Sequence, residues 1–135
     1  MRQHLGAISL VITDYDEAKA YYADVLGFDI IEDRDMGGGK RWVTAAPPGS
    51  SQTRLLLARA ATPAQAAAIG NQAGGRVFLF LHTDDFWRDY RLYRQRGVKF
   101  REEPRDEPYG IVAVFEDLYG NLWDLLQSRH SGEGG

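Results

Sequence analysis

The chain has 135 residues, a formal net charge of −3 and a share of apolar residues that is ordinary for a globular protein. This length favours a single domain with a modest hydrophobic core. The charged residues form no basic patch, so we expect no nucleic-acid partner. The apolar runs are only as long as strands, so we also expect no membrane partner.

The sequence contains no cysteine. This excludes disulfides, thiolate nucleophiles and metals bound by cysteine. The first residues also lack the apolar core of a secretory signal peptide. We therefore expect a cytoplasmic protein.

The first half of the chain predicts one helix and four strands. The first strand is expected over Leu5–Ile12, which is rich in β-branched and aliphatic residues. Asp14 is expected to cap the helix, with Glu17 three residues later completing a capping box, and Gly27 to end it. Further strands are expected over residues 28–32, 41–45 and 53–59, between turns rich in Gly and Pro.

Residues 61–74 are expected to link the two halves. Thr62-Pro63 is a helix-start signal, because proline is favoured at the first helical position, and it predicts a short helix over residues 64–69. The Gly-rich segment 128–135 is expected to be a flexible tail.

The second half predicts the same order of elements. A strand over residues 76–82 leads to a helix that begins at Asp84-Asp85 and ends at Gly97. Strands over 98–101, 111–115 and 122–127 follow, with a polar connection over 102–110. A hairpin turn over residues 117–121 joins the last two strands, because Asp117 can bond to the turn backbone and Gly120 and Asn121 tolerate positive φ.

The two halves form an internal repeat at an offset of about 70 residues. Thr13-Asp14 corresponds to Thr83-Asp84, and Gly27 corresponds to Gly97. Both halves have the order β-α-β-β-β, which predicts one domain, 1–127, built from modules 5–60 and 75–127. Two copies of one supersecondary unit predict two small sheets that share a concavity.

These features resemble the vicinal oxygen chelate superfamily, which includes glyoxalase I, fosfomycin and bleomycin resistance proteins, and extradiol dioxygenases. The resemblance rests on the repeat, the Thr13-Asp14 helix start, YYADVLGF at 21–28 and DLYGNLWDL at 117–125, and it covers residues 5–127. It implies an α+β fold whose two modules form an open eight-stranded cup, and a homodimer. It does not select a function, because the superfamily contains isomerases, transferases, oxygenases and drug-binding proteins.

The resemblance also implies where a divalent metal would be bound. Enzymes of this superfamily usually hold the metal through His and Glu side chains, and the matching positions are Ala7, Leu55, Val77 and Asp124. If Asp85 rather than Asp84 starts the second helix, the third position moves to Phe78. One carboxylate cannot hold a catalytic metal, which takes about three protein ligands. We therefore expect no metal site of the family type and no cofactor.

An alternative metal site remains open at this stage. It would use His4, His82 and Asp124 to bind Ni²⁺, Mn²⁺, Fe²⁺ or Zn²⁺. The sequence has no His-x-x-x-His or His-Glu spacing to support it. We interpret His82 as a loop residue beside a carboxylate, and His130 as part of the tail.

Asp124 is an acidic residue in an otherwise apolar strand. Alternation places Asp124 with Leu122 and Leu126 on one face, and Trp123 and Leu125 on the other. Facing the cup, Asp124 could bind a ligand amine or hydroxyl, or act as a catalytic base with a raised pKa. Facing water, it would be a solvated acid. The sequence does not decide between these interpretations.

Other candidates come from two segments. On predicted strands, Arg41 is a candidate ligand contact, and Trp42 and Phe115 could stack on a flat ligand, although strand aromatics more often form core. In the charged segment 101–110, Glu103 is a second candidate acid or base and Tyr109 a ligand contact. The alternative is that this segment is only a solvated loop.

Two functional hypotheses follow. The first is a metal-free protein that binds a small organic molecule in the cup. The second is an enzyme, either a divalent-metal-dependent lyase, isomerase or dioxygenase with non-standard ligands, or a metal-free acid–base catalyst that uses Asp124 or Glu103. The sequence does not settle whether the protein is an enzyme.

Overall fold

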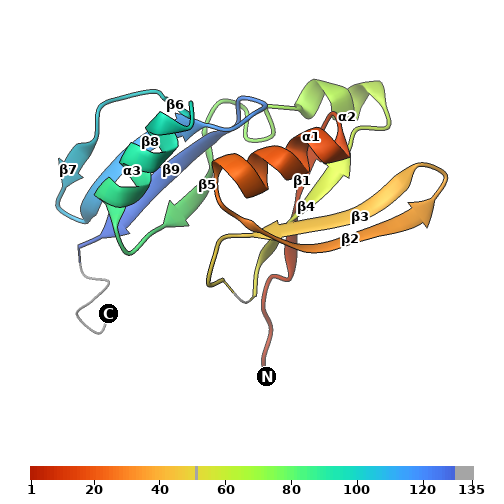
Figure 1. Ribbon diagram of the computed structural model, residues 1–135, viewed down its shortest axis with the longest axis horizontal. Helices are drawn as coiled ribbons and strands as arrows, with labels where there is room; N and C mark the ends of the chain where they lie inside the picture. Colours follow the sequence, from red (N-terminus) through yellow and green to blue (C-terminus); the bar gives the residue numbers. More distant parts are fainter. Residues whose placement is uncertain (51, 130–135) are drawn as a thin grey trace. The chain divides into compact units, whose positions relative to one another are not determined.

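The computed structural model describes residues 1–50 and 52–129 (Figure 1). The chain divides into two compact units, and the division falls between Ile69 and Gly70. The division lies inside the segment 61–74 that was expected to link the modules. Each unit contains one sheet and at least one helix of its own. No helix in the described residues has the length and apolar character needed to cross a membrane.

Unit 1 contains a four-stranded sheet in the order β1-β4-β3-β2. Its strands are β1 (Ala7–Ile12), β2 (Asp29–Gly37), β3 (Lys40–Ala46) and β4 (Arg54–Arg59), and its helices are α1 (Tyr15–Ala20), the π-helical turn η1 (Tyr21–Val25) and α2 (Pro63–Ala68). β1 pairs with β4 in parallel, whereas β3 pairs antiparallel with both of its neighbours. The core lies on the face that carries Leu10, Val43 and Leu57, all fully buried.

Unit 2 repeats this topology, with strand order β5-β9-β8-β6. Its elements are β5 (Val77–His82), α3 (Phe86–Gln95), β6 (Lys99–Phe100), β7 (Arg105–Glu107), β8 (Gly110–Glu116) and β9 (Leu122–Ser128). β5 pairs with β9 in parallel, as β1 does with β4. The repeat and the α+β fold expected from the sequence are therefore confirmed.

The helix starts follow the capping chemistry. Glu17 N donates to Asp14 Oδ1 over 2.9 Å, and Gln65 N donates to Thr62 Oγ1 over 3.1 Å. In α3 the cap is Asp85, because Arg88 N donates to Asp85 Oδ1 over 3.1 Å. The alignment of Asp14 with Asp84 was therefore wrong by one residue, and Asp85 is the structural equivalent.

The hairpin between β8 and β9 is organised by the carboxylate of Asp117. This buried group accepts hydrogen bonds from the backbone N–H groups of Tyr119 and Asn121, the side-chain amide of Asn121 and the indole N–H of Trp123, at 3.0–3.3 Å. Gly120 takes a φ of 97°. The predicted turn is confirmed, and Asp117 bonds to two side chains in addition to the expected backbone.

Several boundaries differ from the sequence prediction. β1 begins at Ala7 instead of Leu5, and β2 continues to Gly37 instead of ending at residue 32. The connection 102–110 contains the short strand β7, which pairs with β8 from Arg105–Val112 to Glu107–Gly110. Ser128 belongs to β9, and Arg129 N donates to Tyr109 O over 2.8 Å, so the expected tail begins later than residue 128. The rest of that tail, residues 130–135, lies outside the described residues and includes His130.

Candidate functional site

The strand register of unit 2 decides which way Asp124 points. Phe115 pairs with Trp123 and their rings stack at 5.7 Å, on the face covered by α3 (Figure 1). Asp124 therefore lies on the opposite face, where its register partners are Val114 on β8 and Phe80 on β5. We call the surface made by Phe80, Val114 and Asp124 the Asp124 face.

The carboxyl group of Asp124 is partly enclosed and incompletely paired. Its Oδ1 atom is buried and has no hydrogen-bond partner among the residues that the structure describes. Burial raises the pKa of Asp124 above its usual value, the charge of Glu102 raises it further, and Arg105 opposes both. Phe80 beside it is 59% exposed, which is unusual for a large aromatic side chain.

Glu102 and Arg105 are neighbours that belong to one small network. Glu102 Oε2 accepts from Arg105 Nε over 3.0 Å and from Val114 N over 3.2 Å. The network fixes the connection before β7 against β8, at the edge of the Asp124 face. Glu103 is exposed in this connection, and Tyr109 is 50% exposed at the turn between β7 and β8.

In unit 1, Trp42 and Arg41 point to opposite faces of β3, so the structure does not bring these two candidates together. Trp42 Nε1 donates to Glu32 Oε1 over 3.1 Å, and Thr44 Oγ1 and Arg54 Nη1 donate to the same oxygen over 3.2 and 3.3 Å. The Trp42 hydrogen bond is the main reason that the pKa of Glu32 lies below its usual value. We call Glu32, Trp42, Thr44 and Arg54 the Glu32 cluster.

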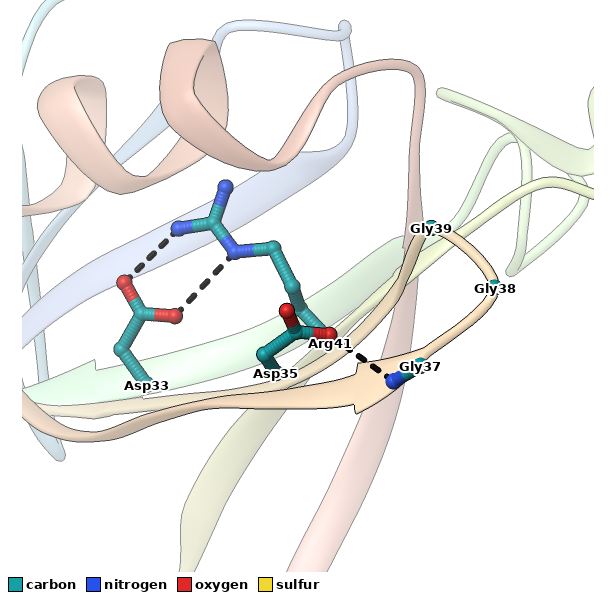
Figure 2. A pocket seen from close by; sticks show the side chains of 6 residues that line it. All are labelled: Asp33, Asp35, Gly37, Gly38, Gly39 and Arg41. Carbon is teal, nitrogen blue, oxygen red and sulfur yellow. Dashed lines mark hydrogen bonds and ion pairs between the residues drawn. The ribbon is translucent and has the colours of Figure 1, made fainter.

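Arg41 is engaged in ion pairs on the side of α1. Figure 2 shows its guanidinium facing Asp33, and it also binds Asp16 over 2.9 Å. The hydrogen bonds from Arg41 and Lys19 hold the pKa of Asp33 at about 2. A pocket of about 460 Å³ lies here between the Gly37–Gly39 turn and these side chains. Because the cation and its carboxylates neutralise one another, Arg41 is best explained as structural.

Phe115 has no exposed surface and packs against Trp123, Phe100 and Tyr93. The proposal that it stacks on a ligand was therefore wrong, because a fully enclosed ring offers no face to a ligand. Alternation alone could not separate the two faces of β8, since both carry apolar residues.

The expected positions of the family metal do not fit a metal. Leu55 lies in the core of unit 1, with 6% exposure, and the strand register pairs Leu56, not Leu55, with Ser9 and Thr44. With Asp85 as the cap, the β5 position is Phe78. Ala7, Leu56 and Phe78 have no ligating atoms in their side chains, so Asp124 alone among these positions carries a donor.

The alternative metal set finds no support either. Within residues 1–50 and 52–129, no group of three or more His, Cys, Asp or Glu side chains is placed to hold a metal ion. His82 shares the Asp124 face but pairs in register with Leu126. His4 precedes β1 in unit 1.

The described residues define an α+β protein of two repeated units, of which the second has the additional short strand β7. Among the four positions that correspond to the family's metal ligands, only Asp124 carries a donor. Residues 4–125 match the family described as the glyoxalase/bleomycin resistance protein/dioxygenase superfamily. The chain belongs to this superfamily.

Similar proteins cover nearly the whole chain. An uncharacterised protein of Shewanella frigidimarina (strain NCIMB 400) is 59% identical over 128 residues, which is 94% of this chain and 95% of the relative. The crystal structure of UcmS2 is 30% identical with a TM-score of 0.81, covering 93% of this chain and 98% of that one. TnmS3, an antibiotic-binding protein from Streptomyces sp. CB03234, is 31% identical with a TM-score of 0.76, covering 94% and 97%.

Proposed function

We propose that this protein binds a small organic molecule without a metal ion, on the Asp124 face. The observation that carries the proposal is the pairing of an exposed aromatic ring, Phe80, with a carboxyl group whose buried oxygen has no partner in the described part of the chain. A ligand with an aromatic surface and a hydroxyl or amine donor would satisfy both groups. The similarity to TnmS3, an antibiotic-binding protein, supports the same class of function.

The Glu32 cluster offers a second aromatic surface in unit 1. Its glutamate accepts three hydrogen bonds at one oxygen, which fixes the indole of Trp42 on the face opposite the core. A ring held in this way loses little conformational entropy when a ligand stacks on it. We therefore propose Trp42 as a ligand contact of unit 1, considered separately from the Asp124 face of unit 2.

The test measures by calorimetric titration how tightly the protein binds 2-naphthol and 2-methoxynaphthalene. The second probe has the same rings as the first but no hydrogen-bond donor. We expect the wild-type protein to prefer 2-naphthol by about tenfold, or about 1.4 kcal/mol, because only the hydroxyl pairs with Asp124. Phe80→Ala should weaken both probes, and Asp124→Leu should remove the preference.

Trp87→Ala is the matched control, because Trp87 is also an exposed aromatic residue but belongs to α3, on the other side of the sheet. It should leave both affinities unchanged. Equal loss of binding in Phe80→Ala and Trp87→Ala would contradict the proposed site.

The unpaired Oδ1 of Asp124 also supports a second candidate, a metal-free acid–base catalyst, because burial shifts the pKa of this carboxyl group upwards, in the direction that a general base requires. Binding and catalysis can be distinguished by incubating the protein with each probe for a long time and then analysing whether the recovered probe has changed chemically. Unchanged probe supports binding alone, whereas Asp124-dependent conversion of a probe would establish catalysis.

A further inference from the structure

A second pocket of about 210 Å³ lies in unit 2, where β5 and β9 begin. The loop that precedes β5, from Gly70 to Arg76, forms one wall, and Phe78, Arg101, Asn121 and Leu122 complete it. Loop and hairpin are in tight contact, since a Cβ on Gly70 would lie 2.1 Å from Tyr119 O. The walls are therefore in place before any ligand arrives.

One residue that lines the pocket, Asn121, carries a buried hydrogen-bond acceptor that no described residue satisfies. Asn121 is 2% exposed, and its Nδ2 donates to both carboxylate oxygens of Asp117, at 3.3 and 3.1 Å. These bonds fix the orientation of the amide and leave Oδ1 unpartnered. A native structure usually satisfies such an atom, so a donor from outside the chain is the expected partner.

The pocket also carries positive charge. Arg76 is exposed and forms no ion pair with any residue of the described ranges. Arg101 lines the pocket too, and its Nη1 lies 3.2 Å from Glu116 Oε2, which also pairs with Lys99. Counting the buried carboxylate of Asp117 with that of Glu116, two carboxylates face three cations, which leaves one positive charge in excess. Guanidinium groups are well suited to carboxylates.

The pocket adjoins the Asp124 face. Leu122, which lines it, is two residues before Asp124 on β9, and alternation puts both side chains on the same face. Phe78 also lines the pocket, and it occupies the β5 position where the family would carry a metal ligand. One ligand could therefore contact both regions.

The size of the pocket limits what it can hold. About 210 Å³ corresponds to about seven water molecules at their volume in the liquid. This is smaller than the sites of drug-sized ligands, which begin at about 300 Å³. The pocket therefore suits one polar end of a molecule.

From these observations we infer that the pocket binds the acidic end of the ligand, in the form of a carboxylate with a neighbouring hydroxyl or N–H group. The carboxylate faces Arg76 and Arg101, and the neighbouring donor bonds to Asn121 Oδ1. This inference rests on the proposed function, because it takes the apolar body of the ligand to lie on the Asp124 face.

The experiment uses three probes of the same shape with the full-length protein: 3-phenyllactate, 3-phenylpropionate, which lacks the hydroxyl, and methyl 3-phenyllactate, which lacks the charge. Affinities are measured by NMR titration of the ¹⁵N-labelled chain. We expect 3-phenyllactate to bind at least about fivefold more tightly than either relative, because each lacks one interaction. The amide signals of Gly75 and the side chain of Asn121 should shift.

Arg76→Gln should weaken 3-phenyllactate several-fold and leave its methyl ester unchanged, because only the acid carries the charge. Arg91→Gln, an exposed arginine on the surface of α3, is the matched control and should change neither affinity. Equal affinities for the three probes, or shifts at Phe80 without shifts at Gly75 and Asn121, would overturn the inference. The 2-naphthol titration tests the proposed function independently, because that probe has no carboxylate.

Discussion

At the scale of single residues, Asp124 shows what alternation can and cannot predict. The sequence correctly predicts that Asp124 and Trp123 lie on opposite faces of β9, because side chains alternate along a strand. It does not indicate which face is covered. That depends on the stacking of Trp123 on Phe115 and on the helix α3 that packs over them, which are long-range contacts.

The environment of Asp124 makes a prediction about stability and pH. Burial raises its pKa in the folded state, so ionisation at neutral pH disfavours folding. We expect Asp124→Asn to be more stable than wild type near pH 7. The gap should shrink as the pH falls through the raised pKa, and it should disappear below the unfolded value of about 4, where the carboxyl group is protonated in both states. Urea unfolding across a pH series measures this.

Asp33 provides a control with the opposite sign. Its pKa is lowered to about 2 by Arg41 and Lys19, so its charge stabilises the fold at neutral pH. Asp33→Asn should be less stable than wild type near pH 7, and the difference should disappear as the pH falls from about 4 to about 2. If Asp124→Asn behaved like Asp33→Asn, the description of Asp124 as a poorly solvated acid would be wrong.

At the scale of elements, the helical segment formed by α1 and η1 is one residue longer than α3, measured from its N-cap to its terminal glycine. From cap to terminal glycine, the first runs from Asp14 to Gly27 and the second from Asp85 to Gly97. The extra residue is absorbed in η1, where Leu26 N donates to Tyr21 O five residues earlier. A π-helical turn is how a helix accommodates a single insertion. The sequence repeat at an offset of 70 therefore matches the helix ends but not their starts.

The position of the second helix start can be tested directly. Asp85→Ala should cost about 1 kcal/mol of stability, because it removes the acceptor of the Arg88 N–H group. Asp84→Ala should cost much less, since it removes only an exposed ion pair with Arg88. Chemical denaturation of both variants measures the difference. A larger loss in Asp84→Ala would restore the alignment with Asp14.

Short-range chemistry made several elements predictable. Contacts between residues only a few positions apart in the sequence define three of these features. They are the helix caps at Asp14 and Thr62 and the turn around Asp117. The strand β7 was missed because its residues are charged, and its pairing with β8 depends on the partner strand.

At the scale of the whole molecule, the same topology serves both units, but the two sheets present different chemistry. In the Glu32 cluster one carboxylate oxygen accepts three hydrogen bonds, whereas the Asp124 face holds an oxygen with no partner among the described residues, beside an exposed ring. This asymmetry follows from single positions in the repeat. Asp124 has Leu56 as its structural counterpart, and Phe80 has Ser9.

Family membership could be predicted from the sequence because it depends on the repeat and on local motifs. The surface that we propose for ligand binding could not be predicted, because its members come from separate strands whose registers are set by tertiary packing. For the same reason, the prediction that Leu55 occupies the position of a family metal ligand was wrong. The register gives that position to Leu56, and a shift of one residue along a strand moves the side chain to the other face of the sheet.

The most direct test of the account is a titration of the metal-free protein with 2-naphthol. The protein is treated with EDTA, dialysed and checked for residual metal, and its affinity is compared before treatment and after adding Zn²⁺, Mn²⁺, Ni²⁺ or Fe²⁺. We predict the same dissociation constant within about twofold in every sample, because the donors of the family metal site are missing. Binding that disappears with EDTA and returns with one of the metals would contradict the account.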